Sequence, residues 1–196
     1  MTSRASCLHR SLLARAVNRI EPRATAASAD SDVVRREFLF IDVDPTRASG
    51  ISSTAEERDS AQALLREVVA FLTGAGWPEP VICMSGNGFY ALYRVDLPND
   101  SAAMSLVKAV LESLAERFNT DAAHVDTSVF NAARSRGHRY EKMKGDATLD
   151  RPHRRSGVVS VPDSLVAVTS QQLEQIVPGR SAPKSALCRT SHKRSG

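Results

Sequence analysis

The segment FLFIDVDP, residues 38–45, decides how the rest of the chain folds around it. Four apolar residues run into Asp42 and Asp44, and Pro45 follows them. Residues two apart on a β-strand point to the same face, so the pattern predicts a buried strand over Glu37–Val43 with two carboxylates side by side near its end. Adjacent carboxylates repel each other unless a cation lies between them. The segment therefore indicates either a site for Mg²⁺ or Mn²⁺, which prefer oxygen ligands, or a solvated turn.

Three helices are predicted from polar caps followed by apolar residues at helical spacing. In the first, Thr54 and Glu57 have the spacing of a capping box, in which each side chain hydrogen-bonds the backbone of the other residue. The predicted helices cover residues 54–74, 100–118 and 170–176, with Thr54, Asp100 and Ser170 as their caps.

Four more strands are predicted from short apolar runs. The residues SGNG at 85–88 separate two of these runs, and Asn-Gly between two strands is the strongest short-range pattern for a hairpin. The predicted strands are Val81–Met84, Phe89–Val95, Val125–Phe130 and Gly157–Val161.

Composition places the chain among ordinary globular proteins. It has 196 residues, of which 42% are hydrophobic and 24% charged. No apolar run approaches the roughly 20 residues that a membrane span needs, so we expect no membrane partner. The three cysteines lie far apart, without the spacing of a zinc site or a disulfide framework. Such cysteine usage favours a reducing compartment, and we expect a cytoplasmic protein.

Charge is distributed unevenly along the chain. Residues 37–126 hold 6 Lys/Arg against 14 Asp/Glu, a net charge of −8. Residues 134–155 hold 8 basic and 3 acidic residues, a net charge of +5, and residues 180–196 hold five basic residues and no acidic one. An acidic block followed by a basic block fits a site that binds metal with one part and phosphate with the other. A solvated charge pattern without a ligand is the alternative.

Three parts of the chain are expected. Residues 1–32 form an N-terminal helix and linker, in which apolar residues between 12 and 20 have helical spacing; this segment can also be interpreted as a transit peptide. Residues 33–177 form the main domain. Residues 178–196 have the composition of a disordered basic tail.

Three features near predicted strand ends could complete a catalytic site. Glycines in the hairpin at 85–88 would let backbone N–H groups approach an anion, and Asp126 would add a third carboxylate for two-metal phosphoryl transfer. The basic segment that follows could hold a triphosphate or a template backbone. The alternatives are an ordinary turn for the hairpin, a cap or turn for Asp126, and a solvated loop for the basic segment.

A resemblance joins these features. The strings IDVDPTRASGISSTAEER, SGNGFYALYRVDLPND, VDTSVFNAAR, KGD and RPHRRS, in this order, resemble the primase-polymerase domains of phages, plasmids and other mobile elements. These domains belong to the archaeo-eukaryotic primase superfamily. The resemblance runs from about Leu13 to Pro162. It implies an α+β fold, the primase catalytic core, with a small mixed or antiparallel sheet of RRM-like character flanked by helices. It also implies a nucleotidyltransferase that joins nucleotides on a single-stranded DNA template during replication of a mobile element.

The resemblance also implies roles for individual residues. Its catalytic and metal-binding positions, for Mg²⁺ or Mn²⁺, are Asp42, Asp44 and Asp126. Its nucleotide-binding positions are Ser85, Gly86, Asn87, Gly88, Tyr90, Arg134 and Lys144. Its phosphate or nucleic-acid contacts are His153, Arg154 and Arg155. The implied partners are nucleoside triphosphates, a single-stranded DNA template and a replicative helicase encoded nearby.

One departure from the family pattern concerns the nucleotide. The family's glycine motif is followed by a histidine two residues after its second glycine, and this chain has Tyr90 there. A tyrosine hydroxyl donates one neutral hydrogen bond, which is weaker than the charge-assisted bond of a protonated histidine. The chain also begins later than its relatives do. We therefore expect either an active enzyme or a truncated, catalytically impaired primase remnant that only binds nucleic acid or nucleotide.

Overall fold

The computed structural model describes residue 30 and residues 33–132 and 145–179. The predicted N-terminal helix and nearly all of the predicted basic tail lie outside these residues, as do Arg134 and Lys144. Among the described residues, no helix is both long and apolar enough to cross a lipid bilayer.

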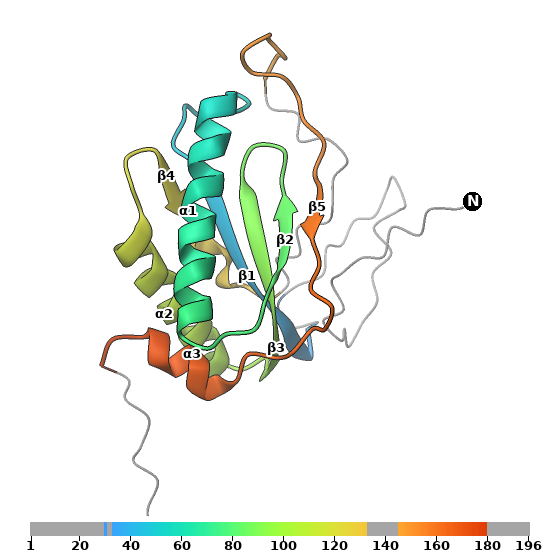
Figure 1. Ribbon diagram of the computed structural model, residues 1–196. Helices are drawn as coiled ribbons and strands as arrows, with labels where there is room; N and C mark the ends of the chain where they lie inside the picture. The colour runs from blue at the N-terminus through green and yellow to red at the C-terminus, as the bar shows by residue number, and fades with distance from the viewer. Residues whose placement is uncertain (1–29, 31–32, 133–144, 180–196) are drawn as a thin grey trace, which may run out of the picture.

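The described chain forms one antiparallel sheet with helices packed against it (Figure 1). In chain order the elements are β1 (Arg35–Pro45), α1 (Ala55–Gly74), β2 (Val81–Met84), β3 (Phe89–Pro98), α2 (Ser101–Phe118), β4 (Ala123–Val125), the 3₁₀-helix η2 (Thr127–Phe130), β5 (Gly157–Ser160) and α3 (Ser170–Ile176). The strands lie in the order β4-β1-β3-β2-β5, and every neighbouring pair is antiparallel.

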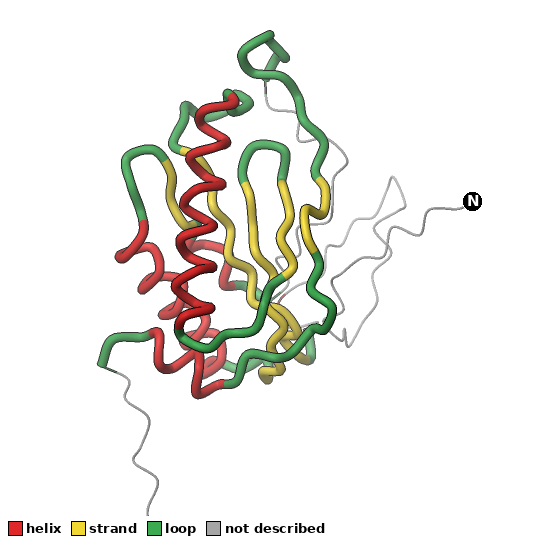
Figure 2. The backbone as a smooth tube through the Cα atoms, in the orientation of Figure 1, coloured by secondary structure: helices red, strands yellow, loops and turns green. Residues whose placement is uncertain are grey.

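The first six elements have the order and arrangement of a split βαβ fold, which RRM domains share. β5 adds a short strand beside β2, at one edge of the sheet (Figure 2). The predicted α+β class, with a small antiparallel sheet flanked by helices, is confirmed.

One part of the core lies between α1 and one face of the sheet. Leu39 of β1 pairs with Tyr93 of β3, and both are buried. The Tyr93 ring meets Trp77, which follows α1, edge to face at 5.0 Å. Because side chains alternate along a strand, Leu39, Ile41 and Val43 share this face. The side chains of Phe40, Asp42 and Asp44 therefore point to the opposite face.

Local capping fixes where the helices begin. The predicted capping box of α1 is present: the Thr54 hydroxyl accepts from the N–H of Glu57, and the Glu57 carboxylate accepts from the N–H of Thr54. Asp100 caps α2 as predicted. For α3 the predicted cap is wrong: Thr169, not Ser170, forms a capping box with Gln172, and Ser170 is the first residue of the helix.

The predicted strand over Val125–Phe130 is also wrong. β4 ends at Val125, and Asp126 caps η2 by accepting hydrogen bonds from the backbone and hydroxyl of Ser128. A short polar side chain that bonds the backbone two residues ahead competes with the hydrogen bonds of a strand ladder, and here the local bond prevails.

Candidate functional site

Asp42 and Asp44 are held on a paired strand. β1 extends past both residues, because Asp44 pairs with His124 of β4 and Pro45 with Ala123. The two aspartates are two residues apart in the strand and therefore lie on one sheet face, the face opposite α1. Asp42 is completely buried and Asp44 is partly exposed. The interpretation as a solvated turn does not apply to this pair.

Asp126 lies next to Asp42 through the backbone. Its N–H donates to the Asp42 carbonyl oxygen at 2.8 Å, directly after the pairing between β1 and β4. Its carboxylate is the cap of η2, with the hydroxyl of Ser128 at 2.6 Å and the N–H of Ser128 at 2.8 Å. The structure thus places Asp126 beside Asp42, and the Asp126 carboxylate serves as the cap of η2.

The donor set at the carboxylate pair fits a hard cation. Oδ1 of Asp44 is buried and has no hydrogen-bond partner among the described residues. Carboxylate oxygens are the ligands that Mg²⁺ and Mn²⁺ prefer. In the part of the chain that the structure describes, no three His, Cys, Asp or Glu side chains are gathered closely enough to hold a metal ion. Asp42 and Asp44 offer two carboxylates to a cation, and Asp126 lies beside them through its backbone.

The hairpin at 85–88 forms as predicted, and hydrogen bonds between Ser85 and Gly88 close its turn. The N–H of Gly88 donates to the Ser85 hydroxyl at 3.1 Å, and the N–H of Ser85 donates to the Gly88 carbonyl at 2.9 Å. Gly86 has a φ of 93°, which favours glycine. The N–H of Gly88 is thus used to close the turn.

Gly88 serves a second purpose, which is close approach to β1. A Cβ atom at this position would clash with the carbonyl oxygen of Val43 and would lie 3.0 Å from Oδ1 of Asp44. Only glycine lets the hairpin lie this close to the carboxylate pair. The hairpin motif and the aspartates are consequently parts of one site.

Asn87 connects the hairpin to the loop between β1 and α1. Its Oδ1 accepts from the N–H of Ser53 at 2.9 Å, and both residues are buried. The Nδ2 of Asn87 is buried without a hydrogen-bond partner among the described residues. Asn87 therefore fixes the loop that leads into the α1 capping box.

Tyr90 lies directly across from Asp42 in the register of β1 and β3. Directly opposed residues of an antiparallel pair point to the same face, with Cβ atoms about 5 Å apart. Tyr90 is buried, its ring centroid is 4.8 Å from that of Phe40, and it pairs with Cys83 of β2 on its other side. Burial raises the pKa of the Cys83 thiol, and a hydrogen bond with Tyr90 offsets this only in part. Tyr90 is thus the cross-strand neighbour of Asp42.

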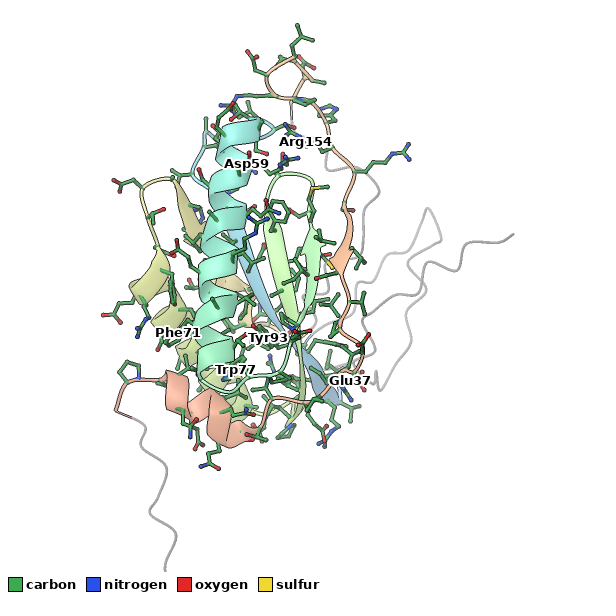
Figure 3. All side chains as sticks on the ribbon, in the orientation of Figure 1. Glu37, Asp59, Phe71, Trp77, Tyr93 and Arg154 are labelled. Atoms are coloured by element: carbon green, nitrogen blue, oxygen red, sulfur yellow. The ribbon has the colours of Figure 1, made fainter. Side chains whose placement is uncertain are left out.

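The basic segment before β5 is anchored to the same loop. Arg154 donates to the carbonyl oxygen of Ser53 at 2.6 Å, at the N-terminal end of α1 (Figure 3). Burial and the nearby Arg58 guanidinium lower the pKa of Arg154. His153 Nε2 lies 2.9 Å from the carbonyl oxygen of Gly145, and Arg155 is exposed. Arg154 is thus joined to the hairpin through Ser53, whose N–H donates to Asn87.

Arg151, which makes the strongest contacts between the basic segment and α1, was not among the residues predicted from the sequence. Its guanidinium makes two hydrogen bonds to the Glu57 carboxylate, at 2.7 and 2.8 Å, and a third to the Ser52 carbonyl oxygen at 2.7 Å. The bond from Arg151 holds the pKa of Glu57 below its ordinary value. Arg151 stands in the RPHRRS string and Glu57 in the predicted capping box, but no sequence pattern pairs residues 94 positions apart.

The loop after β1, the glycine hairpin and the basic segment thus meet at one end of the sheet, next to the carboxylate pair. Asp42 and Asp44 thus lie at the end of the sheet where Arg151 and Arg154 anchor the basic segment to the loop before α1. No family model, curated protein or solved structure matches the chain.

Proposed function

We propose that the chain is a metal-dependent nucleotidyltransferase of the primase-polymerase type, which joins nucleotides on a single-stranded DNA template. Its substrates would be nucleoside triphosphates, and its place would be the replication of a mobile element in the cytoplasm, beside a helicase encoded nearby. The observation that carries this proposal is the close approach of Gly88 to Asp44. The glycine of the hairpin motif lies against Asp44, and Asp126 bonds the backbone of Asp42.

The proposal assigns a divalent cation to Asp42 and Asp44. Bound there, Mg²⁺ or Mn²⁺ would neutralise charge on phosphoryl oxygens during nucleotidyl transfer. The chain's own contribution is to hold the two carboxylates rigidly on the same face of a central strand. Gly88 keeps the adjoining hairpin close without filling the space next to Asp44.

A phosphate-bearing substrate is supported by two neighbouring guanidinium groups. Burial and Arg58 lower the pKa of Arg154, whereas Asp59 and Glu56 act in the opposite direction. Arg58 itself donates to Asp59 at 3.3 Å. Like charges held together are stabilised when an anion lies between them. The Nε of Arg58 is buried without a hydrogen-bond partner in the described residues. We therefore propose that these two arginines contact the triphosphate.

The second candidate function is binding of nucleic acid or nucleotide without catalysis, as in an impaired primase remnant. Complete burial of Asp42, together with a buried aromatic ring at position 90, favours it. A catalytic carboxylate must reach its cation, whereas binding to a DNA backbone needs only basic side chains that reach the phosphates.

Primer synthesis on single-stranded DNA, with Mg²⁺ or Mn²⁺ supplied, tests the first candidate. If the chain is an active enzyme, the wild type should make primers, and Asp44→Asn and Asp42→Asn should each lose at least a hundredfold in primer synthesis. Metal and electrostatic effects of this kind contribute several kcal/mol. Asp121→Asn, which changes an exposed carboxylate before β4, is the matched control and should keep full activity. Equal product from all four proteins would refute the proposal.

The variant Tyr90→His distinguishes an active enzyme from an impaired one. A gain of tenfold or more in primer synthesis would identify Tyr90 as the impaired position, because a protonated histidine makes the stronger phosphate contact. If neither the wild type nor any variant makes primers, and Asp44→Asn still binds single-stranded DNA in a salt-dependent way, binding without catalysis is the correct function.

Nucleotide binding tests the triphosphate contact separately from catalysis. We expect Arg58→Gln to weaken the binding of a nucleoside triphosphate about tenfold, the usual effect of one lost charge-assisted hydrogen bond. Arg66→Gln changes an exposed arginine further along α1 and should leave binding unchanged. Equal affinities for the two variants would exclude Arg58 from the site.

A further inference from the structure

The outer edge of β5 is an exposed apolar strand. β5 is the last strand of the sheet, so no strand of the described chain pairs with its outer edge (Figure 1). Val158 and Val159 are 47% and 54% exposed, and Val161, Leu165 and Val166 follow them on the surface. An uncharged apolar edge strand is a template for pairing with another chain.

The charges around β5 indicate which strand would fit. Residues 157–161, GVVSV, are uncharged; Arg155 lies four positions before Val159, and Asp163 lies four positions after it. β5 itself spans only Gly157–Ser160, and in an antiparallel pair related by a two-fold axis at Val159 the flanking Arg155 of each copy comes to the same end of the pairing as the flanking Asp163 of the other. A shift of the axis to either neighbouring residue separates these charges, placing Asp163 opposite His153 or Gly157.

The side chains fit the same register. With the axis at Val159, Val161 of one copy lies opposite Gly157 of the other. A Cβ atom at Gly157 would meet nothing within 4 Å, so there is open space for the valine. Val159 would lie against its own copy, which removes two half-exposed apolar side chains from water.

We propose that the outer edge of β5 is a self-association surface, on which a second copy of this chain pairs antiparallel about a two-fold axis at Val159. The pairing extends the five-stranded sheet into a continuous ten-stranded sheet. Because β5 is only four residues long, the dimer is a weak one. This inference is independent of the proposed function.

Disulfide crosslinking tests the register. In a full-length protein with Cys7 and Cys188 replaced by serine, Val159→Cys should form a disulfide-linked dimer under mild oxidation, because residues facing each other across the axis have Cα atoms roughly 5 Å apart. Val161→Cys is the matched control. Its two copies would lie about 13 Å apart in this register and should not crosslink. Equal crosslinking of both variants, or none in either, would overturn the proposal.

A charge exchange provides a second test that needs no cysteine. We expect Arg155→Glu to weaken dimerisation, measured by analytical ultracentrifugation, about fivefold or more, since it turns two exposed attractions into repulsions. Adding Asp163→Arg to the same chain should restore it. If the wild type stays monomeric at the highest protein concentration, or if the double variant stays as weak as the single one, the proposed pairing is wrong.

The crosslinking experiment also detects a different occupant of the edge. In Val159→Cys with the native cysteines retained, a disulfide to Cys7 or Cys188 within one chain would mean that another segment of the same chain covers β5. Mapping the disulfide by mass spectrometry distinguishes this outcome, which overturns the dimer, from a link between the introduced thiols of two copies.

Discussion

Replacing Gly88 by alanine should destabilise the protein strongly, although it adds one methyl group. The added Cβ would clash with the carbonyl oxygen of Val43, and Oδ1 of Asp44 would be only 3.0 Å away. The first of these atoms is backbone, so a side-chain rotation cannot relieve the clash. β1 and β3 must instead separate next to the pairing of Val43 with Phe89.

The expected cost follows from these contacts. Overpacking costs about 1–3 kcal/mol, and loosening a ladder hydrogen bond costs about 1 kcal/mol more. The lower entropy of the unfolded alanine chain offsets about 0.5 kcal/mol. We expect Gly88→Ala to lower the free energy of unfolding by about 2–3 kcal/mol. With a urea m-value of about 2 kcal/mol/M, the midpoint falls by about 1–1.5 M.

Urea unfolding followed by tryptophan fluorescence measures this change. Trp77 is the only tryptophan of the chain and is 3% exposed, so its emission reports on the core beneath α1. Gly74→Ala is the matched control, because a Cβ there, at the last residue of α1, meets nothing within 4 Å. Its midpoint should not fall. A difference of less than about 0.3 M between the urea midpoints of Gly88→Ala and Gly74→Ala would be a small fraction of the expected shift. It would mean that β1 does not approach Gly88 closely enough to exclude a Cβ atom.

Three other variants test the contacts around the site and the core. Glu57→Gln should destabilise the protein near neutral pH; because Arg151 depresses the pKa of Glu57, its contribution is present above the ordinary value of 4.5 and is lost as the pH falls through the lowered pKa, so the two unfolding midpoints should converge in acid. A difference that stays constant with pH would contradict this. Asn87→Ala should cost about 1–3 kcal/mol in urea unfolding, because it leaves the buried N–H of Ser53 without its acceptor; a change below roughly 0.5 kcal/mol would contradict the contact. Tyr93→Phe should raise the free energy of unfolding by about 1 kcal/mol, since the Tyr93 hydroxyl is buried without a partner among the described residues, and a loss of stability would show that the hydroxyl is bonded.

The sequence determined the elements whose causes are local. The capping box of α1, the hairpin at 85–88 and the cap of α2 follow from residues within four positions of one another. Where two local patterns competed, the strand predicted from the sequence over Val125–Phe130 did not form. Asp126 follows an apolar run and precedes another, and the hydrogen bond from Ser128 decides that the second run is a 3₁₀-helix.

Only the tertiary structure decided which of these elements form the site. Asp126 reaches the backbone of Asp42 because β4 pairs with β1, and Arg151 reaches Glu57 across 94 residues. Glycine is needed at position 88 because β1 passes too close to leave room for a Cβ atom. The sequence pattern of a turn does not predict this close approach. Spacing along the chain fixes side-chain direction within one strand or helix, whereas strand order and register fix which distant side chains meet. The paired aspartates could thus be predicted from FLFIDVDP alone, and their neighbours could not.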